Sequence, residues 1–211
     1  MRLTRMALDM KKRRTMYALS SPSIFHGVVE SSFPGERKRN LWRIDELRGT
    51  TYLMILSEEE PDLTQAVREL GVDGEAWESR DYTPLLERIA EKSVWRFRLC
   101  ANPTYSENRE GERGKVHAHR TPEYQMAWLI RQGEQHGFKV TEDSFAVTGS
   151  QWYRFMTGNG GRKEVKLLAV TYEGLLTVTD AERFRAVLQN GLGREKAYGM
   201  GLMTVISGGR A

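Results

Sequence analysis

One histidine near the start of the chain, His26, is of a type suited to proton-transfer chemistry. An imidazole with a pKa near ~6.5 gives or takes a proton at neutral pH, so it serves as a general acid or a general base. His26 lies within SPSIFHGVVESSF, residues 21–33, at the edge of the apolar arc that this segment presents as a helix. A histidine there either packs against the core or faces a ligand in a cleft, and its position leaves both alternatives open.

A glycine-rich loop, GLGREKAYGMG at residues 191–201, is the second candidate. Glycines allow positive φ and close backbone approach, which leaves N–H groups able to meet phosphate oxygens. The spacing differs from that of a P-loop, whose Gly-Lys-Ser/Thr opens a helix after a strand. The loop is therefore either a phosphate-binding loop or a helix cap followed by a bulged strand. Its candidate contacts are Gly191, Gly193, Arg194, Lys196, Gly199 and Gly201.

Three other basic segments, residues 36–40, 111–120 and 152–166, are either solvated surface or contacts for a polyanion. In the second, His117 and His119 share one face if the backbone is extended. They could also bind a metal, but no cysteine or well-spaced carboxylate joins them, and we expect no metal site. The third resembles a hairpin suited to a nucleic-acid groove, with aromatic residues that could equally be core. The candidate contacts are Arg37, Lys38, Arg39, Arg113, Lys115, His117, His119, Arg120, Arg154, Arg162 and Lys163.

The elements that must position these residues follow a β-α-β-β-α-β order in the first half of the chain. Ser21 is a plausible N-cap of the helix that carries His26, and Pro22 suits its first turn. Arg48 and Gly49 join the two middle strands. Alternation and helical spacing predict strands at 2–10, 41–47, 50–57 and 81–89, and helices at 21–33 and around 63–70.

The second half repeats this order. Thr121, Pro122 and Gly137 mark the ends of one helix, and Thr179 with Glu182 has capping-box spacing at the start of another. Strands are predicted at 93–101, 145–155, 165–178 and 199–207, with helices at 121–138 and 179–190, a polar stretch at 102–114 and a turn at 157–163. We therefore predict an α+β fold of two tandem ferredoxin-like (βαββαβ, RRM-like) domains, residues 1–91 and 92–211, packed closely together.

Composition is that of an ordinary globular protein. The 211 residues include 39% hydrophobic residues, and 32 Lys and Arg against 28 Asp and Glu give a net charge of +4. One cysteine, Cys100, excludes an internal disulfide and a zinc site built on thiolates. No stretch approaches the ~18 apolar residues of a membrane span. The N-terminal order is also the reverse of a signal peptide, so we expect a cytoplasmic protein with no membrane association.

Five features together resemble the CasE endoribonuclease family of type I-E CRISPR systems. They are the histidine of the first helix, FRLCANP at 97–103, TPEYQMAWL at 121–129, YEGLLTVTD at 172–180 and GLGREKAYGMGL at 191–202. The resemblance implies two ferredoxin-like domains and cleavage of the repeat stem-loop of CRISPR precursor RNA without metal or cofactor. It also implies that the protein keeps the guide RNA as a subunit of the Cascade complex, meeting other subunits and touching DNA only through that complex.

The resemblance also assigns roles to residues. His26 corresponds to the catalytic histidine, residues 191–201 to the glycine-rich loop, and the hairpin around Arg162 to the element at the major-groove side of the stem. The family usually has a tyrosine three residues before the histidine, where this chain has Ser23. The task of that phenol is then missing, or it is done by Ser23 or by another residue such as Tyr17 or Tyr198.

Some alternatives stay open from the sequence. His26 could act as acid or base, and Glu30, one helical turn later, would favour the imidazolium if the two side chains meet. Because Ser23 replaces the tyrosine, an RNA-binding Cascade subunit with weak or no cleavage is the alternative function. A small ferredoxin-like regulator with a structural His26 is a third class, and a flat salt dependence of RNA affinity would favour it.

Overall fold

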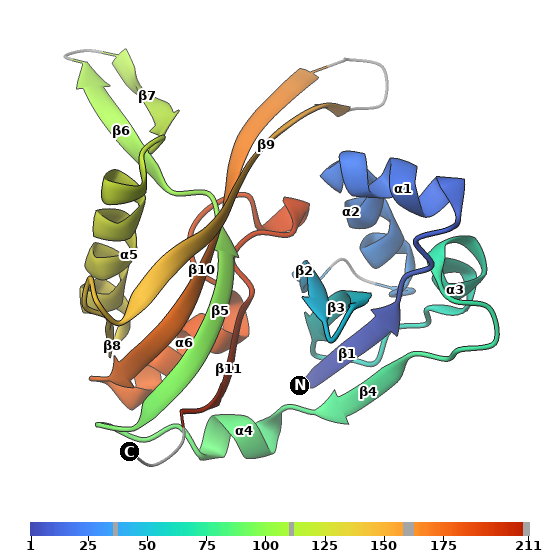
Figure 1. Ribbon diagram of the computed structural model, residues 1–211, viewed down its shortest axis with the longest axis horizontal. Helices are drawn as coiled ribbons and strands as arrows, with labels where there is room; N and C mark the ends of the chain where they lie inside the picture. The colour runs from blue at the N-terminus through green and yellow to red at the C-terminus, as the bar shows by residue number, and fades with distance from the viewer. Residues whose placement is uncertain (36–37, 110–111, 158–162, 209–211) are drawn as a thin grey trace.

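The computed structural model describes residues 1–35, 38–109, 112–157 and 163–208, with the side chains of residues 108–114 outside the description. A four-stranded and a five-stranded antiparallel sheet form the two halves, and a separate two-stranded hairpin extends from the second (Figure 1). Helices α5 and α6 lie against the larger sheet, and α1, α2 and α3 gather beside the smaller one (Figure 1). The fold is thus a mixture of helices and antiparallel sheets, as expected.

The first half contains the smaller sheet, whose strand order is β2-β3-β1-β4. The strands predicted at 41–47 and 50–57 and the helix predicted near 63–70 are confirmed as β2, β3 and α3. Its elements are β1 (Arg2–Ala7), α1 (Arg13–Ser20), α2 (Pro22–Ser31), β2 (Leu41–Leu47), β3 (Thr50–Ser57), α3 (Thr64–Leu70), β4 (Glu78–Asp81) and α4 (Thr83–Glu87).

The second half contains the larger sheet, in the order β11-β5-β10-β8, with β9 running along β10 on the same edge as β8. Its elements are β5 (Val94–Ala101), β6 (Thr104–Arg109), β7 (Glu112–Ala118), α5 (Pro122–His136), β8 (Phe138–Lys139), β9 (Phe145–Thr157), β10 (Lys163–Val178), α6 (Ala181–Asn190), η1 (Lys196–Tyr198) and β11 (Met203–Ser207). All the strands and helices predicted for this half are present.

One prediction for the first half is wrong, and one of its helices was not predicted. Residues 81–89 do not form a strand, because β4 ends at Asp81 and α4 follows. The Asp81 carboxylate accepts the N–H of Thr83 at 2.9 Å, and Pro84 occupies the first turn of α4, where its missing N–H costs nothing. Helix α1, which begins at Arg13, was not predicted.

The β6–β7 hairpin was not predicted, because most of its residues are polar and show no alternating pattern. Within the basic segment 111–120, the extended backbone that the sequence left as a condition is present over β7, Glu112–Ala118. At α6 the capping residue is Asp180 rather than Thr179, with its carboxylate accepting the N–H of Arg183 at 3.0 Å. Gly137 ends α5 in the left-handed region, at a φ of 78°.

One hydrophobic core joins the two halves. Leu41, Leu56 and Ile89 of the first half belong to the same buried cluster as Phe97 and Tyr172 of the second. This shared core fixes the two sheets, and with them α2 and the glycine-rich loop, relative to one another.

A buried arginine adds polar contacts across the same boundary. Arg43 on β2 is 3% exposed, and its guanidinium donates to Asp45 at 2.8 Å. It also donates to the carbonyl oxygen of Leu202 at 2.6 Å and to the hydroxyl of Thr204 at 2.8 Å, both near β11. Because the buried charge is paired and its other donors are used, removing this arginine would be costly.

None of the helices in the described part of the chain combines the length and the apolar character that crossing a membrane requires.

Candidate active site

A cleft of about 610 Å³ separates α2 from the glycine-rich loop. Helix α2 comes from the first half of the chain and η1 from the second, and the two face each other across the space between the sheets (Figure 1). Several candidates from both halves meet here. The lining residues are His26, Val29, Glu30, Lys38, Arg39, Asn40, Gly193, Arg194, Glu195, Lys196 and Ala197.

His26 lies at the boundary between the core and this cleft. Phe25 and Val29 on the same helix are each 1% exposed, whereas 26% of the His26 side chain is exposed. Its Nδ1 is 4.0 Å from Oε1 of Glu30, and its ring meets that of Tyr198 edge to face, with 6.1 Å between the centroids. The imidazole is thus held by neighbours on two sides and still reaches solvent.

The glycine-rich loop owes part of its composition to packing. Gly191, Gly193, Gly199 and Gly201 have φ values of 73°, 81°, 81° and 87°. At Gly199 a Cβ would lie 2.7 Å from the ring of Trp42, and at Gly201 a Cβ would lie 2.7 Å from the carbonyl oxygen of Leu192. The N–H of Gly201 donates to the carbonyl of Cys100 at 2.7 Å. These glycines therefore shape and anchor the loop.

The stretch from Gly193 to Ala197 is the part of the loop that faces the cleft. Within the described residues, the backbone N–H groups of Gly193, Arg194 and Glu195 donate to no other group. Glu195 has a φ of 59°, so the chain turns through the left-handed region here. Successive N–H groups in such a turn form a concave site for an anion.

Cationic side chains surround this stretch. Arg39 and Arg194 are exposed on opposite sides of the cleft, and Lys196 donates to the carbonyl oxygen of Asn190 at 2.8 Å. Burial and the nearby Arg39 guanidinium lower the pKa of Lys196. An anion placed between these cations would relieve their mutual repulsion, which favours phosphate binding.

Lys38 has other partners. Its ammonium group lies 2.7 Å from the carboxylate of Glu59 and 3.2 Å from that of Glu58. Hydrogen bonds to these carboxylates raise the pKa of Lys38. Lys38 therefore lines the cleft, but its positive charge is already balanced by these two carboxylates.

Ser23 does not line the cleft that His26 lines. Its hydroxyl forms a hydrogen bond of 2.9 Å with the hydroxyl of Ser21, which makes no capping bond to the helix. Of the two tyrosines considered for the phenol's task, Tyr17 is 69% exposed on α1. Tyr198 packs between His26 and Phe155, with centroids 6.1 and 4.9 Å away.

The remaining basic candidates lie on two hairpins outside this cleft. On the β9–β10 hairpin, Arg154 is exposed and pairs with Glu164 at 3.3 Å, and Lys163 is also exposed. Of the aromatic residues on this hairpin, Trp152 is on the surface, with 53% of it exposed, whereas Phe155 is 6% exposed and belongs to a small hydrophobic core. Arg37 and Arg162 lie outside the described residues, as do the residues 158–162 predicted as a turn.

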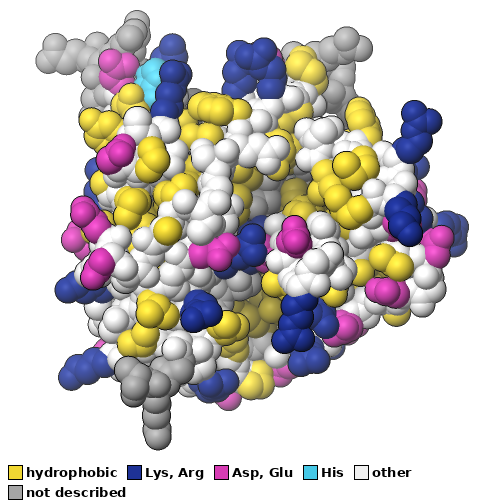
Figure 2. Space-filling model, viewed as in Figure 1, with side chains coloured by type: hydrophobic (Ala, Val, Ile, Leu, Met, Phe, Trp, Pro, Cys, Tyr) yellow, Lys and Arg dark blue, Asp and Glu magenta, His cyan; other side chains and the backbone are white. Residues whose placement is uncertain are grey.

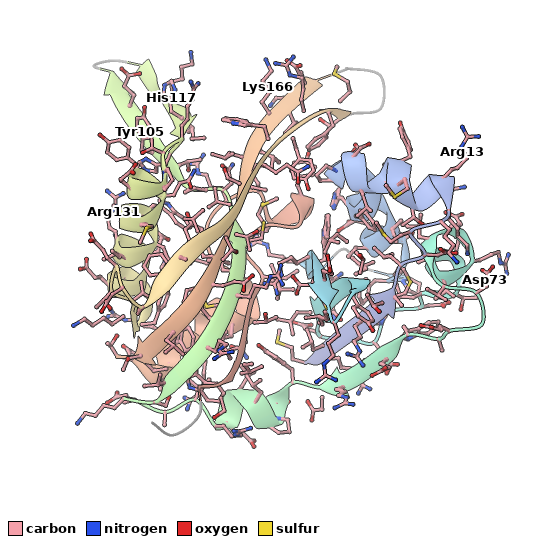
Figure 3. The ribbon with its side chains drawn as sticks, in the orientation of Figure 1. Arg13, Asp73, Tyr105, His117, Arg131 and Lys166 are labelled. Carbon is pink, nitrogen blue, oxygen red and sulfur yellow. The ribbon has the colours of Figure 1, made fainter. Side chains whose placement is uncertain are left out.

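On the β6–β7 hairpin, Lys115 is exposed, and the side chain of Arg113 lies outside the description. His117, His119 and Arg120 line a second pocket rather than the cleft of His26. Lys and Arg side chains gather at the upper edge of the molecule, near the ends of both hairpins (Figure 2). Lys166 on β10 and His117 on β7 mark these two places (Figure 3).

Sequence reasoning did not name Asn40 and Glu195 as parts of the cleft, although both lie in candidate segments, because neither is a basic residue or a glycine. It also missed Tyr105 and Tyr124, which line the second pocket. The first-turn position of Tyr124, just after Pro122, was the available signal. Within the described residues, no three His, Cys, Asp or Glu side chains are grouped as a metal site would require.

Comparisons with known proteins agree with this arrangement. The sequence profile of a family described as "CRISPR associated protein" matches residues 1–207. CRISPR-associated endoribonuclease Cse3 of Thermus thermophilus is 30% identical over 214 residues, covering 96% of this chain and 98% of the relative. The Cascade subunit CasE of Escherichia coli is 31% identical over 117 residues, covering 52% of this chain and 56% of the relative.

Solved structures extend the likeness over the whole fold. A structure of Cse3 bound to a 19-nucleotide RNA superposes with a TM-score of 0.80 at 28% identity, covering 98% of this chain and 100% of that one. The matched family profile, the full-length relative and the shared fold lead to one conclusion. The chain belongs to the CasE/Cse3 family of CRISPR-associated endoribonucleases.

Proposed function

We propose that this protein cleaves the repeat stem-loop of CRISPR precursor RNA through attack of a ribose 2′-hydroxyl, with His26 moving a proton and no metal taking part. The observation that carries the proposal is the position of His26, half-buried in a cleft that also contains Arg39, Arg194 and Lys196. The relative Cse3 is named an endoribonuclease and has been solved with RNA bound, which supports the assignment.

The chemistry needs little beyond what these residues supply. The 2′-oxygen forms a bond to phosphorus and loses its proton, while the bond from phosphorus to the 5′-oxygen breaks and that oxygen gains a proton. His26 supplies or removes one of these protons, a contribution of ~10² to 10⁴-fold. Glu30, 4.0 Å from Nδ1, would stabilise an imidazolium and therefore favours the acid role.

Charge on the phosphorane is the second requirement. Arg39 and Arg194 supply positive charge from the two sides of the cleft, and the N–H groups of residues 193–195 offer fixed dipoles. Such preorganised donors are worth more in a cleft than in open water, because they need not reorient as charge develops. Tyr198 acts as a positioning residue, since its ring fixes the orientation of the imidazole.

The strand orders suggest how the two halves divide this work. The order β2-β3-β1-β4, and the order β11-β5-β10 with β9 beside β10, are both those of a βαββαβ unit. We infer two tandem ferredoxin-like domains, residues 1–91 and 92–211. The first supplies His26 and Arg39, and the second supplies the phosphate-binding loop and both hairpins.

The two hairpins are proposed to hold the stem. On the β9–β10 hairpin the contacts are Arg154, Lys163 and Arg162, which would face the major-groove side. On the β6–β7 hairpin they are Arg113, Lys115 and His117, followed by His119 and Arg120 in the link to α5. These contacts would retain the product RNA in the cytoplasm as part of a Cascade complex, the assembly named for the relative CasE. DNA would then be reached only through that complex.

Ser23 is proposed to have at most a supporting part in the reaction. Its hydroxyl is bound to that of Ser21. The role of the family tyrosine is then taken by Tyr198 or by no residue. If no residue takes it, the protein binds RNA and cleaves it slowly.

Cleavage of a repeat stem-loop in EDTA tests the proposal, with wild type beside His26→Ala and Ser23→Ala. A matched RNA carries a 2′-deoxy sugar before the cut. We expect wild type to cut only the ribose substrate, His26→Ala to lose at least ~10²-fold in rate, and Ser23→Ala to change it by less than about threefold.

Three other outcomes would contradict parts of the proposal. Cutting of the deoxy substrate would exclude attack by the 2′-hydroxyl. Activity that returns only with added metal would exclude the metal-independent route. If no variant cuts but all bind the stem-loop tightly, the protein is an RNA-holding subunit and His26 is structural.

A further inference from the structure

A second pocket, of about 1030 Å³, lies between the β6–β7 hairpin, α5 and β9 and shares no lining residue with the cleft of His26. Tyr105 and His117 on the hairpin and Arg131 on α5 lie along the same side of the molecule (Figure 3). The pocket differs from the catalytic cleft in being mostly aromatic and apolar. Its lining residues include Tyr105, His117, His119, Arg120, Tyr124, Arg131 and Trp152.

Four of its rings form a continuous ladder. Tyr124 and His119 stack with their centroids 5.9 Å apart, and His119 and Tyr105 follow at 5.0 Å. Tyr105 then stacks on His117 at 5.5 Å. The ladder links the first turn of α5 to both strands of the hairpin, so the ring faces are held in place before any ligand arrives.

The ladder also leaves ring surface uncovered. Tyr105 is 47% exposed, Tyr124 is 63% exposed, and Trp152, across the pocket on β9, is 53% exposed. Large exposed aromatic faces in a concave surface are unusual for a side chain with only a structural role. They offer planes on which another flat ring could stack.

Besides the aromatic rings, the pocket has polar groups that could bind the base edge and the phosphate of a nucleotide. The Nε2 atom of His119 is buried and has no hydrogen-bond partner among the described residues. Burial and the nearby Arg131 lower the pKa of His119, which favours the neutral form of this imidazole. Arg120 and Arg131 line the pocket and could bind a phosphate. The side-chain amide of Gln125 donates a hydrogen bond of 3.0 Å to the carbonyl oxygen of His119.

From this geometry we infer that the pocket binds an unpaired nucleobase of the bound RNA, from the single-stranded segment that flanks the stem-loop, by stacking on Tyr124 and Trp152. A paired base is excluded because its faces are already stacked within the helix, whereas splayed single-stranded bases are recognised on aromatic planes. The inference rests on the proposed function for the source of the base. The stacking site itself does not depend on cleavage.

Two probes test the inference separately from the proposed function. The first is a single-stranded RNA hexamer with 2-aminopurine, whose fluorescence is quenched when it stacks. The second is the stem-loop, blocked by a 2′-deoxy sugar at the cut, with and without its unpaired flank. The test protein carries Tyr124→Ser and Trp152→Ser, and the matched control carries Tyr124→Phe and Trp152→Phe. Both side chains are more than half exposed, so we expect both double variants to fold.

We expect wild type to quench the hexamer and to bind the flanked stem-loop more tightly than the bare one. The affinity of the serine variant for the flanked stem-loop should be about 5- to 150-fold lower than that of wild type, which is the range for one stacked base. Its affinity for the bare stem-loop should equal that of wild type. The phenylalanine variant should retain quenching, because it keeps the aromatic faces.

Other results would overturn one claim or the other. If wild type fails to quench the hexamer, or the serine variant quenches it equally, the pocket does not stack bases, and its apolar walls would then suit a protein partner. If the hexamer is quenched through these residues but no stem-loop is bound, the stacking site stands and the proposed function falls.

Discussion

Replacing Gly199 by alanine tests whether the packing of the glycine-rich loop holds the active site together. A Cβ at this position would lie 2.7 Å from Cζ3 and 2.9 Å from Cη2 of Trp42. Trp42 is 3% exposed, and its Nε1 donates to the carbonyl of Ala197 at 3.2 Å, so the ring has little room to move aside. The φ of +81° adds strain for any residue with a Cβ.

The expected loss is the sum of these two effects. A left-handed conformation costs an alanine roughly 1–2 kcal/mol, and overpacking of a buried site costs typically about 1–3 kcal/mol. Gly199→Ala should therefore destabilise the protein by about 2–5 kcal/mol. For a chain of this size each kcal/mol lowers the Tm by roughly 2–4 °C, so the expected decrease is roughly 4–20 °C.

Gly49→Ala is the matched control, because Gly49 has a φ of +80° with no atom within 4 Å of the added Cβ. Gly49→Ala should therefore lose only the stability that the left-handed backbone conformation costs, about 1–2 kcal/mol. Thermal unfolding gives the stabilities, and cleavage is then compared at a temperature where both variants are folded. Only Gly199→Ala should slow cleavage, since it displaces η1 and Tyr198 from α2. Equal losses of stability in the two variants would refute the steric argument.

Two further predictions concern charges. Arg43→Ala should destabilise the protein by about 3–5 kcal/mol, because it removes the nearer partner of the buried Asp45 carboxylate and leaves only Arg98, at 3.4 Å. Arg43→Met with Asp45→Leu should recover part of this loss in urea unfolding. For RNA binding, the charge of Lys196 is lost as the pH rises through its pKa, which Arg39 helps to lower. Titrating stem-loop affinity at fixed salt should show its alkaline midpoint moving to higher pH in Arg39→Gln, and an unmoved midpoint would contradict this coupling. Lys196→Met, which cannot titrate, provides the baseline.

The sequence predicted the elements well where the local signals were complete. Pro22 and the apolar arc were enough to place the helix of His26, and Gly137 was enough to end α5. Residues 81–89 were wrongly assigned because a weak alternation was weighed above Pro84, which is typical of a first helical turn. The β6–β7 hairpin was missed because it packs too few apolar residues to show a period.

The site was predictable only in part, for a different reason. His26 and the loop could each be named from local patterns, but their meeting depends on a core shared between residues more than 100 positions apart, such as Leu41 and Tyr172. The aromatic ladder is likewise assembled from β6, β7 and α5, and no single segment shows it. Partners such as Glu58 and Glu59, which balance Lys38, are also visible only in three dimensions.

The cleft depends on both halves of the chain, and this couples activity to the packing between them. His26 comes from α2, and the N–H groups proposed to bind the phosphate come from the loop. Trp42 of β2 contacts both, because its ring packs against Phe25 of α2 and under Gly199, and its Nε1 donates to the carbonyl oxygen of Ala197. A substitution that loosens this contact need not unfold either sheet to separate the proton-transfer group from the phosphate site. Losses of cleavage should therefore exceed losses of RNA affinity when the boundary is weakened, because the hairpins proposed to hold the stem both belong to the second half.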